Sequence, residues 1–202
     1  MRIKLFLLLI SLSVSIIGAK NIISSNVCYI DSLQYYQSYK KEFPIHKCNS
    51  IVSKHDSTLV PLTDTTYVFK TDTLENNWLH YIIVGEVKNN IIICEQDYHK
   101  EIYYIINKIS NNKYKVVGSP QFYKKFILCI EGSYTDSPNR IQVWEYDSTK
   151  IDLYCDIKIH ELLHDFFAPS HGYIGKNCLF LRDMDRKYIC IPLKCRKVYK
   201  GN

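Results

Sequence analysis

The segment His160-Glu161-Leu162-Leu163-His164 places two histidines and a glutamate at a spacing that suits metal chemistry. Side chains four positions apart lie on the same face of an α-helix, so both imidazoles could bind one Zn²⁺. The intervening glutamate would then act as general base on a metal-bound water. A catalytic zinc site also needs a third protein ligand. The downstream candidates for that ligand are His171, Asp165, Asp183 and Asp185.

The same segment resembles the motif of the zincin peptidases. This resemblance implies that His160 and His164 are zinc ligands, that Glu161 is the catalytic base and that zinc is the cofactor. The chain departs from the metzincin form of the motif, because Phe167 stands where that form has glycine and His171 lies one residue beyond its third histidine. A zinc-dependent metallopeptidase is therefore the alternative function that the sequence offers.

The residues around this segment favour a different interpretation. Apolar and polar residues alternate from 151 to 159, which is typical of a strand with one buried face. Pro169 limits any helix that follows to at most about nine residues. We therefore predict a short turn between two strands here, and we favour neither a metal site nor a catalytic residue in it.

All eight cysteines follow the N-terminal apolar segment, and an even number suits pairing in an oxidising compartment. The sequence leaves on the order of a hundred complete connectivities open. Cys178 and Cys190 flank a predicted hairpin that turns near residues 183–185, so they are the candidates for a disulfide between opposed strand positions. Cys94 and Cys129 lie in apolar runs, where buried thiols fit equally well.

The N-terminus has the arrangement of a secretory signal peptide. Arg2 and Lys4 precede an apolar stretch at residues 5–17, and Ala19 follows as the predicted cleavage position. The stretch has about 13 residues, fewer than the ~20 that cross a bilayer. We predict a signal peptide (1–19), a helical or irregular segment (20–58) and an antiparallel β domain (59–202). The mature chain would have no transmembrane anchor and would be exported to the periplasm, the outer envelope or the extracellular space.

The mature sequence predicts a mainly β protein. Apolar residues at helical spacing before Pro44 predict one N-terminal helix at residues 32–42, and β-rich segments separated by turn residues follow from residue 59. The predicted strands lie at residues 65–69, 79–87, 91–96, 102–108, 114–117, 126–131, 141–146, 151–159, 178–182 and 188–193. Connections this short make neighbouring strands antiparallel. We expect an antiparallel β-meander that is partly propeller-like, a sandwich or an open barrel.

The block from residue 78 to residue 193 resembles a group of uncharacterised exported bacterial proteins built from β-hairpins with propeller-blade-like repeats. The segments that carry the resemblance are residues 81–86, 101–108, 118–122 with 126–128, 139–144, 172–181 and 187–191. The turn at residues 122–125 reads Phe-Tyr-Lys-Lys, where the propeller-type repeat has Ser-Pro-Asp-Gly. The resemblance implies hairpin-rich sheets and names no activity.

The net charge and the number of tyrosines indicate which kinds of binding partner the protein could have. The formal net charge of +6 falls to about +4 once Arg2 and Lys4 are removed, and this balance does not indicate a nucleic acid partner. The 17 tyrosines could supply a binding face for a protein or a glycan, because their rings cover apolar surface while their hydroxyls form hydrogen bonds. We therefore expect an exported, non-catalytic binding or structural module.

Overall fold

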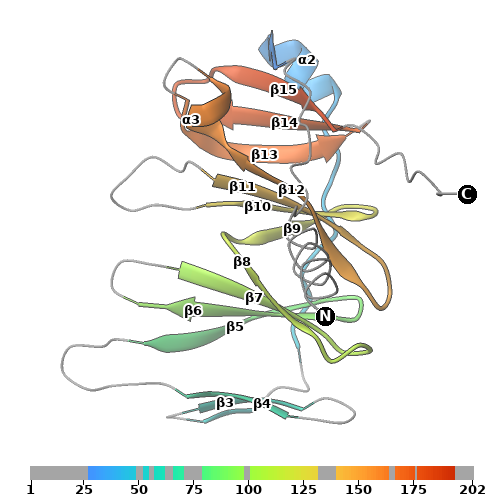
Figure 1. Cartoon of the computed structure of the whole chain (residues 1–202), viewed down its shortest axis with the longest axis vertical. Helices are drawn as coiled ribbons and strands as arrows, with labels where there is room; N and C mark the ends of the chain where they lie inside the picture. Colours follow the sequence, from blue (N-terminus) through green and yellow to red (C-terminus); the bar gives the residue numbers. More distant parts are fainter. Residues whose placement is uncertain are drawn as a thin grey trace, which may run out of the picture.

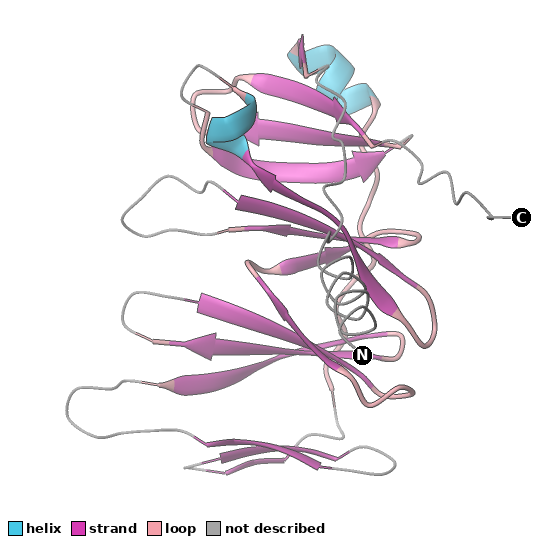
Figure 2. Cartoon of the chain, viewed as in Figure 1, coloured by secondary structure: helices cyan, strands magenta, loops and turns pink. Residues whose placement is uncertain are grey.

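The described part of the chain folds into four antiparallel β-sheets that lie one above another (Figure 1). The computed structural model describes residues 27–48, 52–54, 57–61, 66–70, 79–97, 101–131, 140–163, 167–175 and 177–193. Strands make up most of these residues, and the helices among them are short (Figure 2). The predicted mainly β, antiparallel fold class is confirmed.

Each sheet is built largely from strands that follow one another in the chain. Sheet I contains β2 (Val52–Lys54), β3 (Ser57–Pro61) and β4 (Thr66–Lys70). Sheet II contains β5 (His80–Val87), β6 (Asn90–Gln96), β7 (Glu101–Asn107) and β8 (Lys113–Val116). Sheet III contains β9 (Pro120–Phe122), β10 (Phe126–Ile130), β11 (Arg140–Tyr146) and β12 (Ile151–Lys158). Sheet IV contains β13 (Pro169–Gly175), β14 (Cys178–Asp183), β15 (Tyr188–Pro192) and, beside β15, the distant β1 (Cys28–Ile30).

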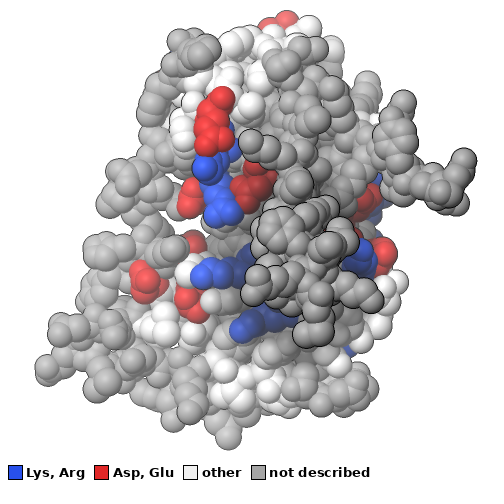
Figure 3. All heavy atoms as spheres, viewed as in Figure 1, with Lys and Arg blue, Asp and Glu red and all other residues white. Residues whose placement is uncertain are grey.

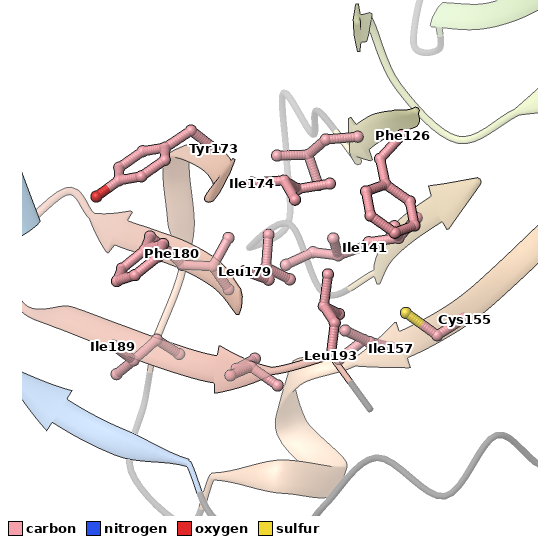
Figure 4. Close-up of a cluster of buried hydrophobic side chains, with 14 of the residues drawn as sticks. Phe126, Ile141, Cys155, Ile157, Tyr173, Ile174, Leu179, Phe180, Ile189 and Leu193 are labelled. Atoms are coloured by element: carbon pink, nitrogen blue, oxygen red, sulfur yellow. The ribbon is translucent and has the colours of Figure 1, made fainter. Parts of the chain in front are cut away.

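Hydrophobic clusters fill the spaces between adjacent sheets. The cluster between sheets I and II joins Val60 to Ile91, and the cluster between sheets II and III joins Ile92 to Phe122. A third and larger cluster lies between sheets III and IV, where side chains of β10, β11 and β12 meet those of β13, β14 and β15 (Figure 4). Sheets II and III are therefore covered on both faces.

Burial of both faces explains the uninterrupted apolar runs of the sequence. In β6, Ile91 and Ile93 face sheet I, Ile92 faces sheet III, and all three side chains are fully buried. Successive side chains of a strand point to opposite faces, so a strand between two layers needs apolar residues at every position. The run marks β6 as a central strand of the stack.

The predicted alternation along β12 holds in most of the strand and is wrong at Leu153. Cys155 is buried, but Leu153 lies at the surface. Val143 pairs with Cys155 and the next residue, Trp144, pairs with Leu153, so Tyr154 is an extra residue in a β-bulge. A bulge of this kind changes which face the following side chains occupy. The alternation of polar and apolar residues at 151–159 in the sequence gives no sign of this bulge.

The segment predicted as a separate N-terminal part, residues 20–58, contributes to the stack of sheets. After β1, the chain descends along the sheets (Figure 1) and forms backbone bridges from Phe43 to Phe122 and from His46 to Glu86. The predicted boundary between residues 58 and 59 falls inside β3. β3 pairs with its neighbours in the sequence, β2 and β4, so sheet I extends across this boundary.

The predicted helix is α2 (Ser32–Gln37), which is shorter than the expected range of 32–42. It begins at a capping box, in which the Asp31 carboxylate accepts from the Gln34 backbone N–H (2.7 Å) and the Gln34 side chain accepts from the Asp31 N–H (3.2 Å). It ends early because the chain beyond it extends to pair with sheet III, where the Phe43 N–H donates to the Phe122 carbonyl at 2.7 Å.

Tyr35 anchors α2 to sheet IV. Its side chain is only 1% exposed, and its ring packs against the rings of Tyr173 (centroids 4.9 Å apart) and Tyr188 (5.0 Å). The Tyr173 hydroxyl donates to the Tyr35 backbone carbonyl. The Tyr35 hydroxyl is buried and has no hydrogen-bond partner among the residues that the structure describes. The anchor therefore depends on the ring and the backbone, and the Tyr35 hydroxyl adds nothing to it.

We expect Tyr35→Phe to raise the free energy of unfolding by about 1 kcal/mol, because it removes a hydroxyl that is buried without a hydrogen bond. Tyr35→Ala should instead lower it by about 3 kcal/mol or more, since it leaves a cavity beneath α2. Urea denaturation followed by circular dichroism measures both changes. A Tyr35→Phe variant less stable than the parent protein would mean that the hydroxyl has a partner after all.

Within the described ranges, the structure contains no helix with the length and apolar character of a membrane span. The predicted signal peptide, residues 1–19, lies outside the described residues. Its cleavage after Ala19 stays a prediction.

Candidate functional site

The histidine-rich segment forms a single helical turn, α3 (Ile159–Leu162), at the end of β12. The Leu163 N–H donates to the Ile159 carbonyl at 3.0 Å, and Leu163 itself has an extended backbone (φ −120°, ψ 131°). A zinc-binding pair at positions i and i+4 needs a helix that continues through the second histidine. The described helix ends before His164, which itself lies outside the described residues.

The two described side chains of the motif, His160 and Glu161, point toward solvent. They are 61% and 59% exposed, and the Glu161 carboxylate pairs with the Lys158 ammonium at 3.0 Å. An exposed ion pair of this kind costs little to break and contributes little to stability. Neither side chain lies in the buried, shaped environment in which a carboxylate activates a metal-bound water.

The candidate third ligands have other positions and roles. His171 is exposed on β13 opposite Arg182, and Asp165 lies outside the described residues. The buried Asp183 carboxylate accepts from the Lys187 N–H at 2.6 Å and shapes the β14–β15 turn, in which Asp185 is exposed. Among the described residues, no group of three or more histidine, cysteine or acidic side chains is arranged to hold a metal ion.

No disulfide joins the cysteines that the structure describes, and the predicted opposition of Cys178 and Cys190 is wrong, because each lies opposite a residue two positions away from the other. Cys178 pairs with Pro192, and Cys190 pairs with Phe180. The difference arises because the last paired residues before the β14–β15 turn are Arg182 and Tyr188, which centres the turn on residue 185. Cys195 lies outside the described residues.

The feature of the surface most suited to recognition is an aromatic area around α2. It combines exposed residues of α2 and its C-terminal end with residues of β14 and β15, and we call it the α2 surface. Its members are Leu33, Tyr36, Tyr39, Arg182 and Tyr188. Leu33, Tyr36 and Tyr39 are 65%, 55% and 49% exposed. These side chains are large and lie within residues 33–39, so they offer exposed contact area to a partner.

Hydrogen bonds and ring contacts hold the α2 surface in one arrangement. The Arg182 guanidinium donates to the Tyr36 hydroxyl at 3.2 Å, and the rings of Tyr36 and Tyr188 lie 6.3 Å apart at 67°. Beneath them, the Tyr39 ring packs at 5.2 Å from Tyr173, which stacks on Phe180. Aromatic pairs with these edge-on and offset geometries gain energy beyond their buried area.

The buried tyrosine hydroxyls beneath the α2 surface carry no charge. Burial raises the pKa of the Tyr35 and Tyr173 hydroxyls, so both stay protonated at physiological pH. On the face seen in Figure 3, charged side chains lie mostly over the middle of the stack, and the end formed by sheet IV is mostly uncharged. A ligand at the α2 surface would meet rings, hydroxyls and the Arg182 cation.

Sequence reasoning found part of this surface and missed the rest. The helical spacing of Leu33, Tyr36 and Tyr39 predicted the helix, but Arg182 lies 146 residues beyond Tyr36. Nothing in the local sequence of β14 indicates that its arginine meets the helix. Only the pairing of β1 with β15 brings the two segments together.

The search among known proteins found no protein-family model, no curated protein and no solved structure that matches the chain. The resemblance to exported β-hairpin proteins stays a prediction, and the function has to be inferred from the side chains and their arrangement.

Proposed function

We propose that this protein is an exported, non-catalytic binding module that recognises a protein partner through the α2 surface. The observation that carries the proposal is the exposure of Leu33 and Tyr36 on a helix that Tyr35 anchors to sheet IV, and of Tyr39 just beyond its end. Exposing apolar side chains of this size to water is unfavourable, and a bound partner that covers them removes this cost in free energy.

A protein is the partner that the chemistry of the α2 surface fits best. Tyrosine and arginine are enriched among the residues that dominate binding energy at protein interfaces. A tyrosine loses little conformational entropy on binding because it has only two side-chain torsions, and Tyr36 is already restrained by Arg182 and Tyr188. Side chains that are already restrained lose less conformational entropy on binding, so the affinity for the partner is higher.

The export part of the proposal rests on the N-terminal sequence. Arg2 and Lys4, the apolar residues 5–17 and the small Gly18 and Ala19 are the features of a cleaved signal peptide. The consecutive antiparallel meanders of sheets II and III support the resemblance to exported proteins with propeller-blade-like hairpins. The N-terminal features are the basis for proposing a module that acts in the periplasm, in the outer envelope or outside the cell.

Site-specific photo-crosslinking in the cells that naturally produce the protein tests the proposal. A benzophenone amino acid at position 33 should give one discrete protein adduct, and Tyr36→Ala should reduce its yield about tenfold, as expected for the loss of a major contact. The control is the same amino acid at position 109, because Ile109 is similarly exposed (52%) and lies in the β7–β8 turn.

Three results would contradict the proposal. An equal pattern of adducts from positions 33 and 109 would mean that the α2 surface has no special affinity. An adduct that glycosidases remove would identify a glycan in place of a protein. One equivalent of zinc in the purified protein, lost in a His160→Ala variant, would support the zinc-peptidase alternative.

A further inference from the structure

Three cysteines from distant parts of the sequence meet on sheet IV. Cys28 of β1 lies directly opposite Cys190 of β15 in the antiparallel register. Cys190 also lies opposite Phe180 of β14, which is two positions from Cys178. Residues two positions apart on a strand share a face, and so do directly opposed residues of paired strands. The three sulfur-bearing side chains therefore project from the same face of the sheet.

The Cys178 and Cys190 thiols are within hydrogen-bonding distance of one another, and all three cysteines are at least partly accessible to solvent. Cys28 is exposed, and Cys178 and Cys190 are partly exposed. Burial, followed by a hydrogen bond with the Cys178 thiol, raises the pKa of Cys190 to about 12, and Cys28 is near enough to raise it further. Cys190 thus lies between two other accessible cysteines, one on each neighbouring strand, whereas the remaining described cysteines are buried.

The remaining described cysteines form a contrasting group. They are buried between the sheets, and they are Cys48, Cys94, Cys129 and Cys155. Burial raises the pKa of Cys94, Cys129 and Cys155, so their thiols stay protonated and react poorly. Among the described cysteines, an oxidant from solution can therefore reach Cys28, Cys178 and Cys190 most readily.

We propose that Cys28 and Cys190 form a reversible disulfide that fastens β1 to β15, with Cys178 as the neighbouring thiol that can exchange with it. Directly opposed residues of an antiparallel pair have Cα atoms roughly 4.5–5.5 Å apart, within the range that a disulfide spans. Diagonal residues such as Cys178 and Cys190 have Cα atoms roughly 7–8 Å apart, which is too far without backbone movement. The register thus selects Cys28 as the partner of Cys190.

The bond forms by exchange with a small-molecule or protein disulfide, RSSR. The Cys28 thiol loses its proton and attacks RSSR, which gives a mixed disulfide, Cys28–S–S–R, and releases one RSH. The Cys190 thiol loses its proton and attacks the Cys28 sulfur, which gives the Cys28–Cys190 bond and a second RSH. The two cysteines lose two electrons and two protons, and RSSR gains them. The more exposed Cys28 reacts first, because the high pKa of Cys190 leaves very little of that thiol in the reactive thiolate form.

The disulfide would act on an otherwise weak part of the fold. β1 is a three-residue strand at the edge of sheet IV, and it leads directly to the capping residue Asp31 of α2. A covalent bond at Cys28 prevents this edge strand from separating and closes a very long loop of chain. The inference stands without the proposed function, because it depends on strand register alone.

The test uses the full chain equilibrated with mixtures of reduced and oxidised glutathione. After alkylation and digestion without reduction, mass spectrometry should find a peptide that joins Cys28 to Cys190 in the parent protein and in Cys178→Ser. Oxidation should raise the melting temperature of both proteins by on the order of 10 °C and leave that of Cys28→Ser unchanged.

Several outcomes would overturn the inference. The Cys28–Cys190 peptide could be missing at every glutathione ratio, or a Cys178–Cys190 peptide could dominate. A rise in melting temperature that persists in Cys28→Ser would place the stabilising bond elsewhere. Because Cys28 is exposed, its replacement by serine should leave folding intact, and far-ultraviolet circular dichroism of the reduced variant checks this.

Discussion

We expect Gly118→Ala to lower the free energy of unfolding by about 3 kcal/mol or more, because the added methyl group would overlap the backbone of β10. A Cβ atom at Gly118 would lie 1.9 Å from the Ile130 carbonyl oxygen, 2.6 Å from its carbonyl carbon and 3.3 Å from the Glu131 nitrogen. All of these atoms belong to the main chain, so no side-chain rotation relieves the overlap. The substitution has to move either β10 or the connection between β8 and β9.

Either movement disturbs the packing between layers. β10 is an inner strand of sheet III, with Leu128 facing sheet IV and Ile127 facing sheet II. Chemical denaturation followed by circular dichroism measures the effect, and Ser119→Ala is the matched control because Ser119 is the exposed neighbour of Gly118. A Gly118→Ala variant within about 1 kcal/mol of the parent protein would show that the contact is looser than the structure has it.

We expect Asn107→Leu to lower the free energy of unfolding by about 3 kcal/mol, since it removes a buried polar side chain that serves several hydrogen bonds at once. The Asn107 amide donates to the Asn90 side chain at 3.0 Å and to the Ser148 carbonyl at 3.2 Å. Its carbonyl oxygen accepts from the backbone N–H groups of Ile109 and Ser110, at 3.0 and 2.9 Å. Leucine has a similar size but leaves all of these groups without Asn107 as a partner.

A double-mutant cycle makes this prediction specific to the Asn90–Asn107 bond. Both side chains are fully buried, so Asn90→Leu alone also leaves a partner unsatisfied. Replacing both should cost about 1 kcal/mol less than the sum of the single losses, because no unpaired amide then remains at that contact. Asn112→Ala is the control, since Asn112 is exposed in the same turn. Additive losses in the cycle would contradict the bond.

The hydrogen bond between Asn107 and Ser148 also connects two neighbouring sheets of the stack. Asn107 ends β7 of sheet II, and Ser148 lies in the β11–β12 turn of sheet III. Together with the apolar cluster between these sheets, this hydrogen bond fixes their relative position at one edge. Loss of Asn107 is therefore expected to weaken the junction between two layers as well as the turn itself.

The sequence by itself determined the mainly β class and most of the strands. The predicted strands at residues 91–96 and 151–159 differ by one residue each from β6 (Asn90–Gln96) and β12 (Ile151–Lys158). They were predictable because β-branched residues and turn residues act through the local backbone, and the next strand is only a short connection away. The zinc-site alternative on the His160 segment depended on a longer helix, and the described helix α3 ends at Leu162.

Only the tertiary structure decided which distant segments meet. Pairing of β1 with β15 places Cys28 opposite Cys190 and brings Tyr36 to Arg182, and the bridge from Phe43 to Phe122 ends the helix early. These contacts join residues far apart in the chain, and local sequence carries no record of them because each depends on pairing with a distant segment. The physical reason is that burying sheet faces against one another gains more free energy than any local preference of the segments involved.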